Sequence, residues 1–210
     1  MRIYIKGDYT KEIPFDYLEL AKRMWFENYQ GEGIPLSYSG FLQIRDRNDI
    51  AIHLKLDKQD YDERWLHIPI QEGIKYRFFS QIDEELNLDY EDAYVTDFRE
   101  NGDCLRLAST HLELLTLDKR AFYTMAIEIA TIFNGQISED DKKTWLTIEE
   151  FKEKHQDILS LTFDEANEMS LEEIQTIDAI DDPIWEELDR KREEYIKIHG
   201  ERVYDEEEDE

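Results

Sequence analysis

One segment restricts the fold of this chain more than any other: a helical pattern over residues 117–133, LDKRAFYTMAIEIATIF. Its polar positions recur one helical turn apart and form a single narrow stripe: Arg120, Thr124, Glu128 and Thr131. Apolar side chains occupy the rest of the circumference: Phe122, Met125, Ala126, Ile129, Ala130 and Phe133. Such a helix is normally covered on more than one side. We therefore expect a central helix packed on a sheet, ended by a left-handed cap at Asn134-Gly135.

The first half of the chain carries strand patterns that would supply this sheet. Residues 2–5 alternate weakly. Residues 41–56 predict a hairpin, because Ile50, Ile52, Leu54 and Leu56 alternate with Ala51, His53 and Lys55. A second hairpin is predicted over residues 93–109, where Asn101-Gly102 suits a tight turn with positive φ.

Four further elements are predicted with weaker patterns. Pro14 can occupy the first turn of an early helix. Residues 64–70, RWLHIPI, resemble an edge strand, since Pro69 lacks the amide that a sheet interior needs. A helix is favoured after Phe79, and residues 111–115 would extend the sheet.

The last third of the chain predicts short helices. Three sites match the capping box, in which a hydroxyl and a carboxyl three residues later satisfy first-turn amides: Thr147/Glu150, Thr162/Glu165 and Ser170/Glu173. Asp182-Pro183 is a fourth helix start. The resulting helices would cover residues 148–158, 163–169, 171–179 and 183–198.

Together these elements predict an α+β protein, an antiparallel sheet of hairpins packed on a central helix. The length of 210 residues suits one main domain. We expect an α+β domain over residues 1–158, a helical extension packed on it over residues 159–204, and a disordered acidic tail over residues 205–210.

The charge of the chain excludes one class of partner. There are 52 acidic and 25 basic residues, a net charge of −27. Residues 136–210 alone hold 27 acidic and 9 basic residues, a net charge of −18. Nucleic-acid binding depends on Lys and Arg displacing counterions, and no basic patch that would reverse the field is visible in the sequence. We expect no direct binding to nucleic acid.

Cellular location is predicted from what the sequence lacks. The single cysteine, Cys104, cannot form an internal disulfide, so a reducing compartment is the simpler interpretation. The N-terminus carries no apolar run typical of a signal peptide, and no segment approaches the roughly 20 apolar residues of a membrane span. We expect a cytoplasmic protein without a membrane partner.

The sequence gives no enzyme signature. The five histidines are scattered without the spacing of a metal site, so we assign no metal and no cofactor. Glu150-Phe151-Lys152 formally matches the Glu-x-Lys element of metal-dependent nucleases, but the capping box with Thr147 already explains Glu150. We therefore expect no catalytic residues.

One acidic turn stays without a structural explanation: residues 139–145, EDDKKTW. Its candidate partner-binding residues are Glu139, Asp140, Asp141 and Trp145. Trp145 could be either a core anchor or an exposed contact.

The stretch from Ala121 to His155 resembles the immunity proteins of bacterial polymorphic toxin systems. The similar pattern is a buried helix, an Asn-Gly pair, a short strand, an acidic turn, a Trp, and a helix opened by Thr-x-Glu-Glu-Phe at residues 147–151. The resemblance implies an α+β inhibitor that binds a cognate toxin and blocks it sterically, without catalytic residues. The region after His155 is not part of the pattern, which leaves the subfamily open.

The leading hypothesis is a non-enzymatic acidic binding protein with a basic protein partner, most specifically an immunity protein that inhibits a bacterial toxin. Acidic surfaces steer association with basic partners, although they also serve solubility alone. Two alternatives stay open: a DNA-mimic inhibitor from a mobile element, and an enzyme with a carboxylate-based site.

Overall fold

The computed structural model describes residues 1–12, 14, 16–26, 35–40, 51–68, 84–91, 104–111 and 113–176, and the single residues 190, 193, 196 and 197. The chain divides into two compact units, Met1–Thr176 and Ile177–Glu210. The expected domain boundary after residue 158 falls inside the first unit, because the helix over residues 163–176 packs on the central helix. The predicted tail over residues 205–210 lies outside the described residues.

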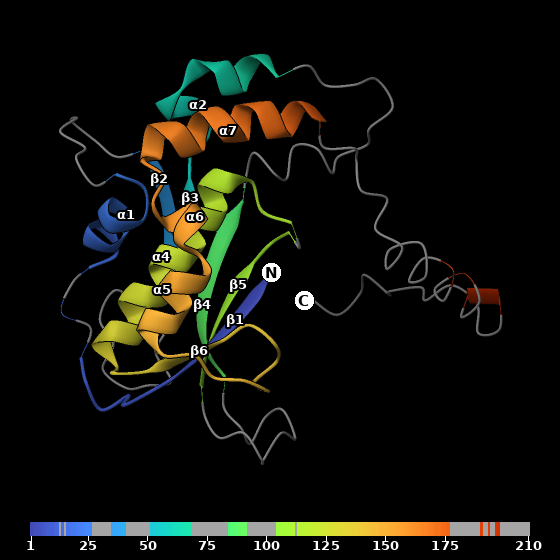
Figure 1. Cartoon of the computed structure of the whole chain (residues 1–210). Coiled ribbons are helices and arrows are strands. Elements are labelled where there is room, and N and C mark those ends of the chain that lie inside the picture. Colours follow the sequence, from blue (N-terminus) through green and yellow to red (C-terminus); the bar gives the residue numbers. More distant parts are fainter. Residues whose placement is uncertain are drawn as a thin grey trace, which may run out of the picture. The chain divides into compact units, whose positions relative to one another are not determined.

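The first unit contains a six-stranded antiparallel sheet with the strand order β2-β3-β4-β5-β1-β6 (Figure 1). Its strands are β1 Arg2–Lys6, β2 Leu36–Gly40, β3 Ala51–Leu56, β4 Glu85–Glu91, β5 Cys104–Ser109 and β6 Gln136–Ser138. The predicted α+β class with an antiparallel sheet is confirmed.

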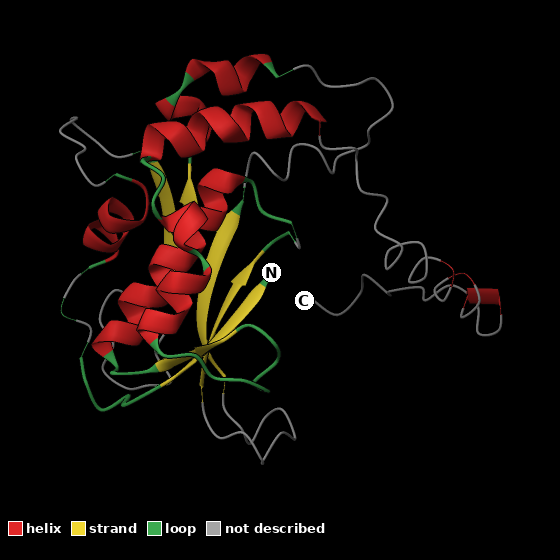
Figure 2. Cartoon of the chain, in the orientation of Figure 1, coloured by secondary structure: helices red, strands yellow, loops and turns green. Residues whose placement is uncertain are grey.

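The helices are α1 Tyr17–Trp25, α2 Lys58–Tyr61, the 3₁₀ helix η2 Glu63–His67, α4 Thr116–Ile132, α5 Ile148–Lys154, α6 Gln156–Leu159 and α7 Phe163–Thr176. In the view of Figure 2, α4, α5 and α6 lie over one face of the sheet, and α2 and α7 lie at the upper end of the strands. The central position predicted for α4 is confirmed: it packs on β1, β5 and β6 and is flanked by α1, α5, α6 and α7.

The core lies between α4 and alternate residues of the strands. In the sheet, Ile52 pairs with Leu88, Leu88 with Leu107, and Leu107 with Ile3, so one apolar row crosses four strands. These four side chains are buried. The alternation predicted for β3 is confirmed, since Leu54 is buried as well, and it follows from the two-residue period of a strand.

The C-terminal end of α4 makes a close approach to β1. Asn134 takes the left-handed conformation, with φ 49°, and the amide of Gly135 donates to the carbonyl of Ala130 at 2.8 Å, as in the predicted cap. A Cβ on Gly135 would lie 2.4 Å from the carbonyl oxygen of Lys6. Gly135 therefore allows β6 to start beside β1 directly after the helix.

The N-terminal end of α4 is capped by side chains from another helix. Leu115, the N-cap residue, offers no side-chain acceptor. Instead, the amide of Thr116 donates to Glu173 Oε2 at 2.8 Å, and the amide of Leu117 donates to Ser170 Oγ at 2.8 Å. Two of the orphan amides of the first turn are satisfied in this way.

This arrangement corrects the third predicted capping box. Ser170 and Glu173 do not start a helix, because α7 runs unbroken from Phe163 to Thr176. Both residues accept hydrogen bonds from first-turn amides, but those amides belong to α4. The other two boxes are confirmed, with Thr147 and Glu150 at the start of α5 and Thr162 and Glu165 at the start of α7.

We expect Glu173→Ala to lower the free energy of unfolding by roughly 1–3 kcal/mol, because the Thr116 amide, in a buried residue, would lose its acceptor. Urea unfolding followed by circular dichroism measures the effect. Glu172→Ala, at an exposed position of the same helix, is the matched control and should stay within about 0.5 kcal/mol of the parent chain. Equal effects of the two substitutions would contradict the capping of α4 by the side chains of α7.

Several weaker predictions are wrong. Residues 64–67 belong to η2 rather than to a strand, because the Asp62 carboxylate accepts from the Arg64 amide at 3.0 Å and closes a helical turn there. β4 occupies residues 85–91, so residues 85–88 of the segment predicted as a helix form a strand, while residues 80–83 lie outside the described residues. Leu114 and Leu115 turn into the core instead of extending the sheet.

Two more predictions are settled only in part. The early helix starts at Tyr17 with Asp16 as its N-cap, so Pro14 lies before it. β3 pairs with β2 at residues 36–40, while residues 41–50 and the proposed Asn101-Gly102 turn lie outside the described residues.

Candidate partner-binding surface

The acidic turn after β6 is held closed by Asp140. Its carboxylate accepts hydrogen bonds from Ser138 Oγ at 2.9 Å, from the Thr144 amide at 2.8 Å and from Thr144 Oγ1 at 2.6 Å. The hydrogen bond from the Thr144 side chain is the largest cause that lowers the pKa of Asp140, to about 2. Asp140 thus has a structural role in the turn.

Glu139 also contacts its own chain. Lys154 Nζ donates to Glu139 Oε2 at 2.6 Å, and His155 Nε2 lies 2.9 Å from Glu139 Oε1. These contacts join the turn to the end of α5, and the Glu139 side chain is only 15% exposed. Asp141 is exposed and takes a positive φ of 56°.

Trp145 lies between the two predicted alternatives, because it is half-buried against β1. Lys6 Nζ is 4.4 Å from the centre of its ring, within the range of a cation–π contact. The next residue, Leu146, forms a β-bridge with Ile137. Of the four candidate partner-binding residues, Glu139, Asp140 and Trp145 thus help to hold the turn on the domain, and Asp141 is open to solvent.

We expect Asp140→Ala to open this turn. The amide of Thr144 would lose its acceptor, so its hydrogen exchange should accelerate by roughly tenfold while amides in α4 stay unchanged. Asp141→Asn, at the next position and exposed to solvent, is the control and should leave Thr144 exchange within about twofold. Unchanged exchange in Asp140→Ala would show that other contacts hold the turn.

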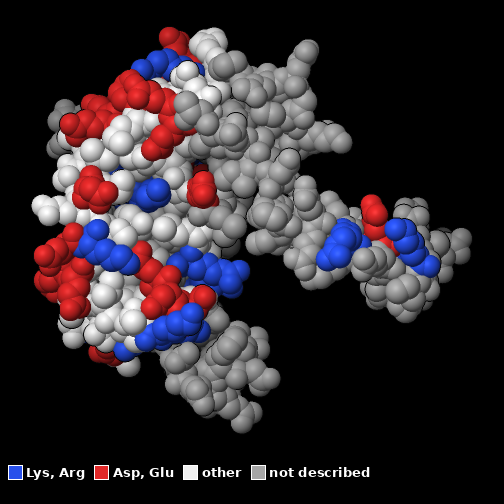
Figure 3. Space-filling view, turned by 45° about the vertical axis from the view of Figure 1, so that its right-hand side comes forward, with Lys and Arg blue, Asp and Glu red and all other residues white. Residues whose placement is uncertain are grey.

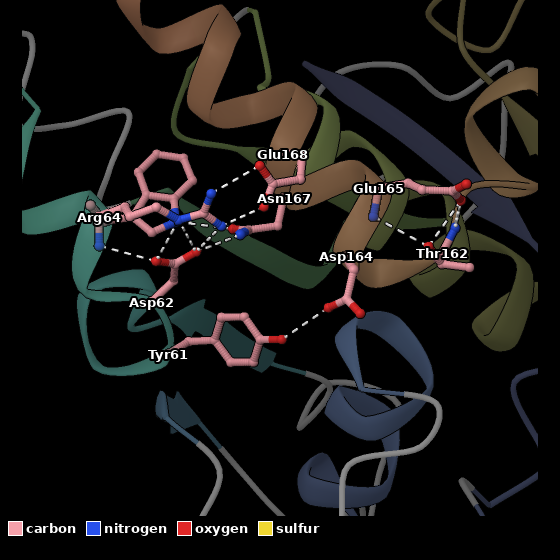
Figure 4. Close-up of polar contacts among 9 residues, drawn as sticks. Tyr61, Asp62, Arg64, Thr162, Asp164, Glu165, Asn167 and Glu168 are labelled. Carbon is pink, nitrogen blue, oxygen red and sulfur yellow. Dashed lines mark hydrogen bonds and ion pairs between the residues drawn. The ribbon is translucent and has the colours of Figure 1, made fainter.

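A second acidic surface lies on α7, which a polar network joins to η2 (Figure 4). Arg64 donates to Asp62 through Nε at 3.0 Å and to Glu168 through Nη1 at 2.9 Å. The hydrogen bond from Arg64 is the largest cause that lowers the pKa of Asp62, to about 2. Asn167 completes the network, since its Nδ2 donates to Asp62 at 2.8 Å and its Oδ1 accepts from Trp65 Nε1 at 3.0 Å.

The first turn of α7 is fixed by an aromatic cluster. The ring of Phe163 lies 4.5 Å from that of Tyr61 and 5.2 Å from that of Phe26, measured between centroids. Tyr61 OH donates to Asp164 at 3.3 Å. The contacts among the rings and the hydrogen bond hold α7 against the ends of α1 and α2.

These contacts fix the position of α7, and the outer face of this helix is acidic. Residues 155–176 contain six acidic residues and no Lys or Arg. The exposed side chains of α7 between residues 164 and 175 are Asp164, Glu165, Glu168, Met169, Glu172 and Gln175. Figure 3 shows acidic side chains gathered at the level of α7; lower on the same face, acidic side chains are interleaved with most of the Lys and Arg side chains.

The sequence does not predict this surface, because its capping pattern at Ser170 predicts two separate helices, over residues 163–169 and 171–179, in place of α7. The signal was present in the spacing: Glu165, Glu168 and Glu172 fall on one side of an uninterrupted helix. Ser170 and Glu173, on the opposite side, face α4.

A buried charged cluster lies under α2 and the start of α4. Lys58 Nζ is 3.0 Å from Asp118 Oδ2, and these side chains are 0% and 2% exposed. Burial raises the pKa of Asp118 to about 6, although Lys58 opposes this shift. Nearby, Glu84 accepts from the Thr110 amide at 2.6 Å and contacts His111 Nδ1 at 2.5 Å. Because solvent does not reach Lys58 and Asp118, we assign this ion pair a structural role in the core.

In the described part of the chain, no group of three or more His, Cys, Asp or Glu side chains could hold a metal ion. None of its helices has the length and apolar composition needed to cross a bilayer. Comparisons with protein-family models, curated proteins and solved structures find no match.

Proposed function

We propose that this chain is a non-enzymatic binding protein that captures a basic protein through its acidic surface. In its most specific form the proposal is an immunity protein that inhibits a cognate bacterial toxin by direct binding. The observation that supports this proposal is the charge of the chain: its net charge is −27, and residues 136–210 contribute −18 of it. A field of this sign attracts basic partners and accelerates their association.

The roles of individual carboxylates support a binding function over a catalytic one. Glu150 of the Glu-x-Lys element accepts from the Thr147 amide at 2.8 Å, which is the capping role. Asp118, whose pKa is raised to about 6, is buried against Lys58. A catalytic carboxylate must reach its substrate, whereas these two serve helix capping and core packing.

Co-expression with the products of the genes that flank its own gene tests the proposal. We expect one basic product to form a stable complex with the full chain, and expression of the chain to restore growth where that product is toxic. Affinity should fall steeply as NaCl is raised from about 50 to about 500 mM, because exposed charges are screened. The proposal fails if every flanking product leaves the chain unbound and growth unaffected.

A competition experiment with duplex DNA separates the DNA-mimic alternative. A DNA mimic would compete with duplex DNA for a DNA-binding enzyme, whereas an immunity protein blocks one cognate toxin. Displacement of DNA from several unrelated DNA-binding proteins would favour the mimic over the immunity protein.

A further inference from the structure

The outer face of α7 combines charge with an exposed apolar side chain. Met169 is 41% exposed, and Glu165, Glu168 and Glu172 lie within one turn of it in sequence. Methionine adapts its unbranched side chain to different partners and is frequent on binding surfaces. The face therefore offers an apolar contact beside a row of carboxylates.

Three carboxylates of this face are held in position before any partner binds. Glu165 accepts from the Thr162 amide at 2.8 Å, Glu168 accepts from Arg64, and Asp164 accepts from Tyr61. Side chains that are already ordered lose less conformational entropy on association. Successive acids at i, i+4 are separated by about 6 Å along the helix.

The sign of the charge limits what can cover this face. Anionic lipid surfaces and nucleic acid would be repelled by the acids. A second copy of the chain would place one row of carboxylates against another. A basic helix, by contrast, presents Lys and Arg with the same repeat of about 6 Å and can place an apolar side chain over Met169.

We propose that the outer face of α7, with Met169 as its apolar contact, is the docking surface for a basic amphipathic helix of the partner protein. This inference rests on the proposed function and specifies where the partner binds and by what chemistry. Arg64, which lies beside Glu168, limits the surface on the η2 side.

The experiment uses the full chain and a synthetic helical peptide of about 20 residues, with Lys at i, i+4 and Leu between them, followed by amide NMR. We expect shift changes centred on α7. A peptide of the same composition in scrambled order should bind at least about tenfold more weakly. Shift changes centred elsewhere, or equal binding of the scrambled peptide, would overturn the docking surface.

Two matched pairs of variants test the contacts. Glu172→Lys should weaken peptide binding by roughly tenfold, whereas Glu149→Lys, the same charge change at an exposed site on α5, should stay within about threefold. Met169→Ala should weaken binding by roughly fivefold, whereas Leu18→Ala, at an exposed apolar site on α1, should have no effect. Equal effects within each pair would reject the assignment to α7.

The two proposals fail separately. If a flanking product binds Met169→Ala and Glu172→Lys as tightly as the parent chain, the docking surface is wrong and the proposed function stands. If the peptide docks on α7 while no flanking product binds, the surface is supported and the immunity function is wrong.

Discussion

Lys58→Met is expected to lower the free energy of unfolding by roughly 3–5 kcal/mol at neutral pH. The substitution leaves Asp118 buried without the cation 3.0 Å from its carboxylate. Removing one member of a buried pair is costly because the remaining charge loses its compensation and cannot reach water. Since a whole domain is stable by only about 5–15 kcal/mol, urea unfolding should show a large shift of the midpoint.

Two further variants separate the ion pair from the loss of packing. Lys58→Met combined with Asp118→Leu should recover most of the lost stability, because a buried pair replaced by apolar residues is often neutral. Lys152→Met, at an exposed position, should stay within about 0.5 kcal/mol of the parent chain. If the double variant is no more stable than Lys58→Met, packing rather than charge determines the cost.

The same pair predicts a dependence of stability on pH. The folded state raises the pKa of Asp118 from 3.8 to about 6, so it binds this proton more tightly than the unfolded chain does. The contribution of this group to stability is therefore greatest below about pH 4 and is lost as the pH rises through about 6. Asp118→Asn should remove this part of the slope in urea unfolding measured between about pH 4 and about pH 7. An unchanged slope would contradict the raised pKa.

Trp65→Ala is the second substitution with a large expected effect, a loss of roughly 3–5 kcal/mol. The side chain is 1% exposed and its Nε1 donates to Asn167 Oδ1 at 3.0 Å. Truncation would leave a cavity beneath η2 and remove one of the contacts that hold α7. The change in unfolding free energy is measured by urea denaturation, followed by circular dichroism in place of Trp fluorescence.

Neighbouring substitutions define the source of the Trp65 effect. Trp65→Phe keeps most of the buried area but removes the indole donor, so its cost should be intermediate. Leu66→Ala removes a side chain that is 58% exposed and should stay within about 0.5 kcal/mol of the parent. The structural role of Trp65 is refuted if Leu66→Ala is as destabilising as Trp65→Ala.

The fold was predictable where a pattern was long or local. The periodicity of residues 117–133 predicts α4 and its covering on several sides, and the capping pair of Thr147 and Glu150 predicts the start of α5 at Ile148, where the structure has it. The strand prediction for residues 64–67 is wrong because aromatic and branched residues favour strands in general, whereas here the Asp62 carboxylate accepts from the Arg64 amide and closes a helical turn.

The candidate site was predictable only in part, for a similar reason. Asp140 is bound by Ser138 and Thr144, so its role could have been inferred from the spacing of turn residues. The contact between Glu139 and Lys154 spans 15 residues, and that between Arg64 and Glu168 spans 104. Such pairs depend on the tertiary arrangement, which the spacing of charges along the sequence does not determine.

The capping of α4 by side chains of α7 has a consequence for biosynthesis. During translation, residues 116–132 leave the ribosome well before Ser170 and Glu173, so the central helix emerges with uncapped first-turn amides. Its N-terminal turn can reach its final hydrogen bonding only when α7 has been made and has docked. Completion of the core is thereby coupled to the synthesis of α7. In a nascent chain halted before residue 170, the first turn of α4 would stay uncapped and would fray.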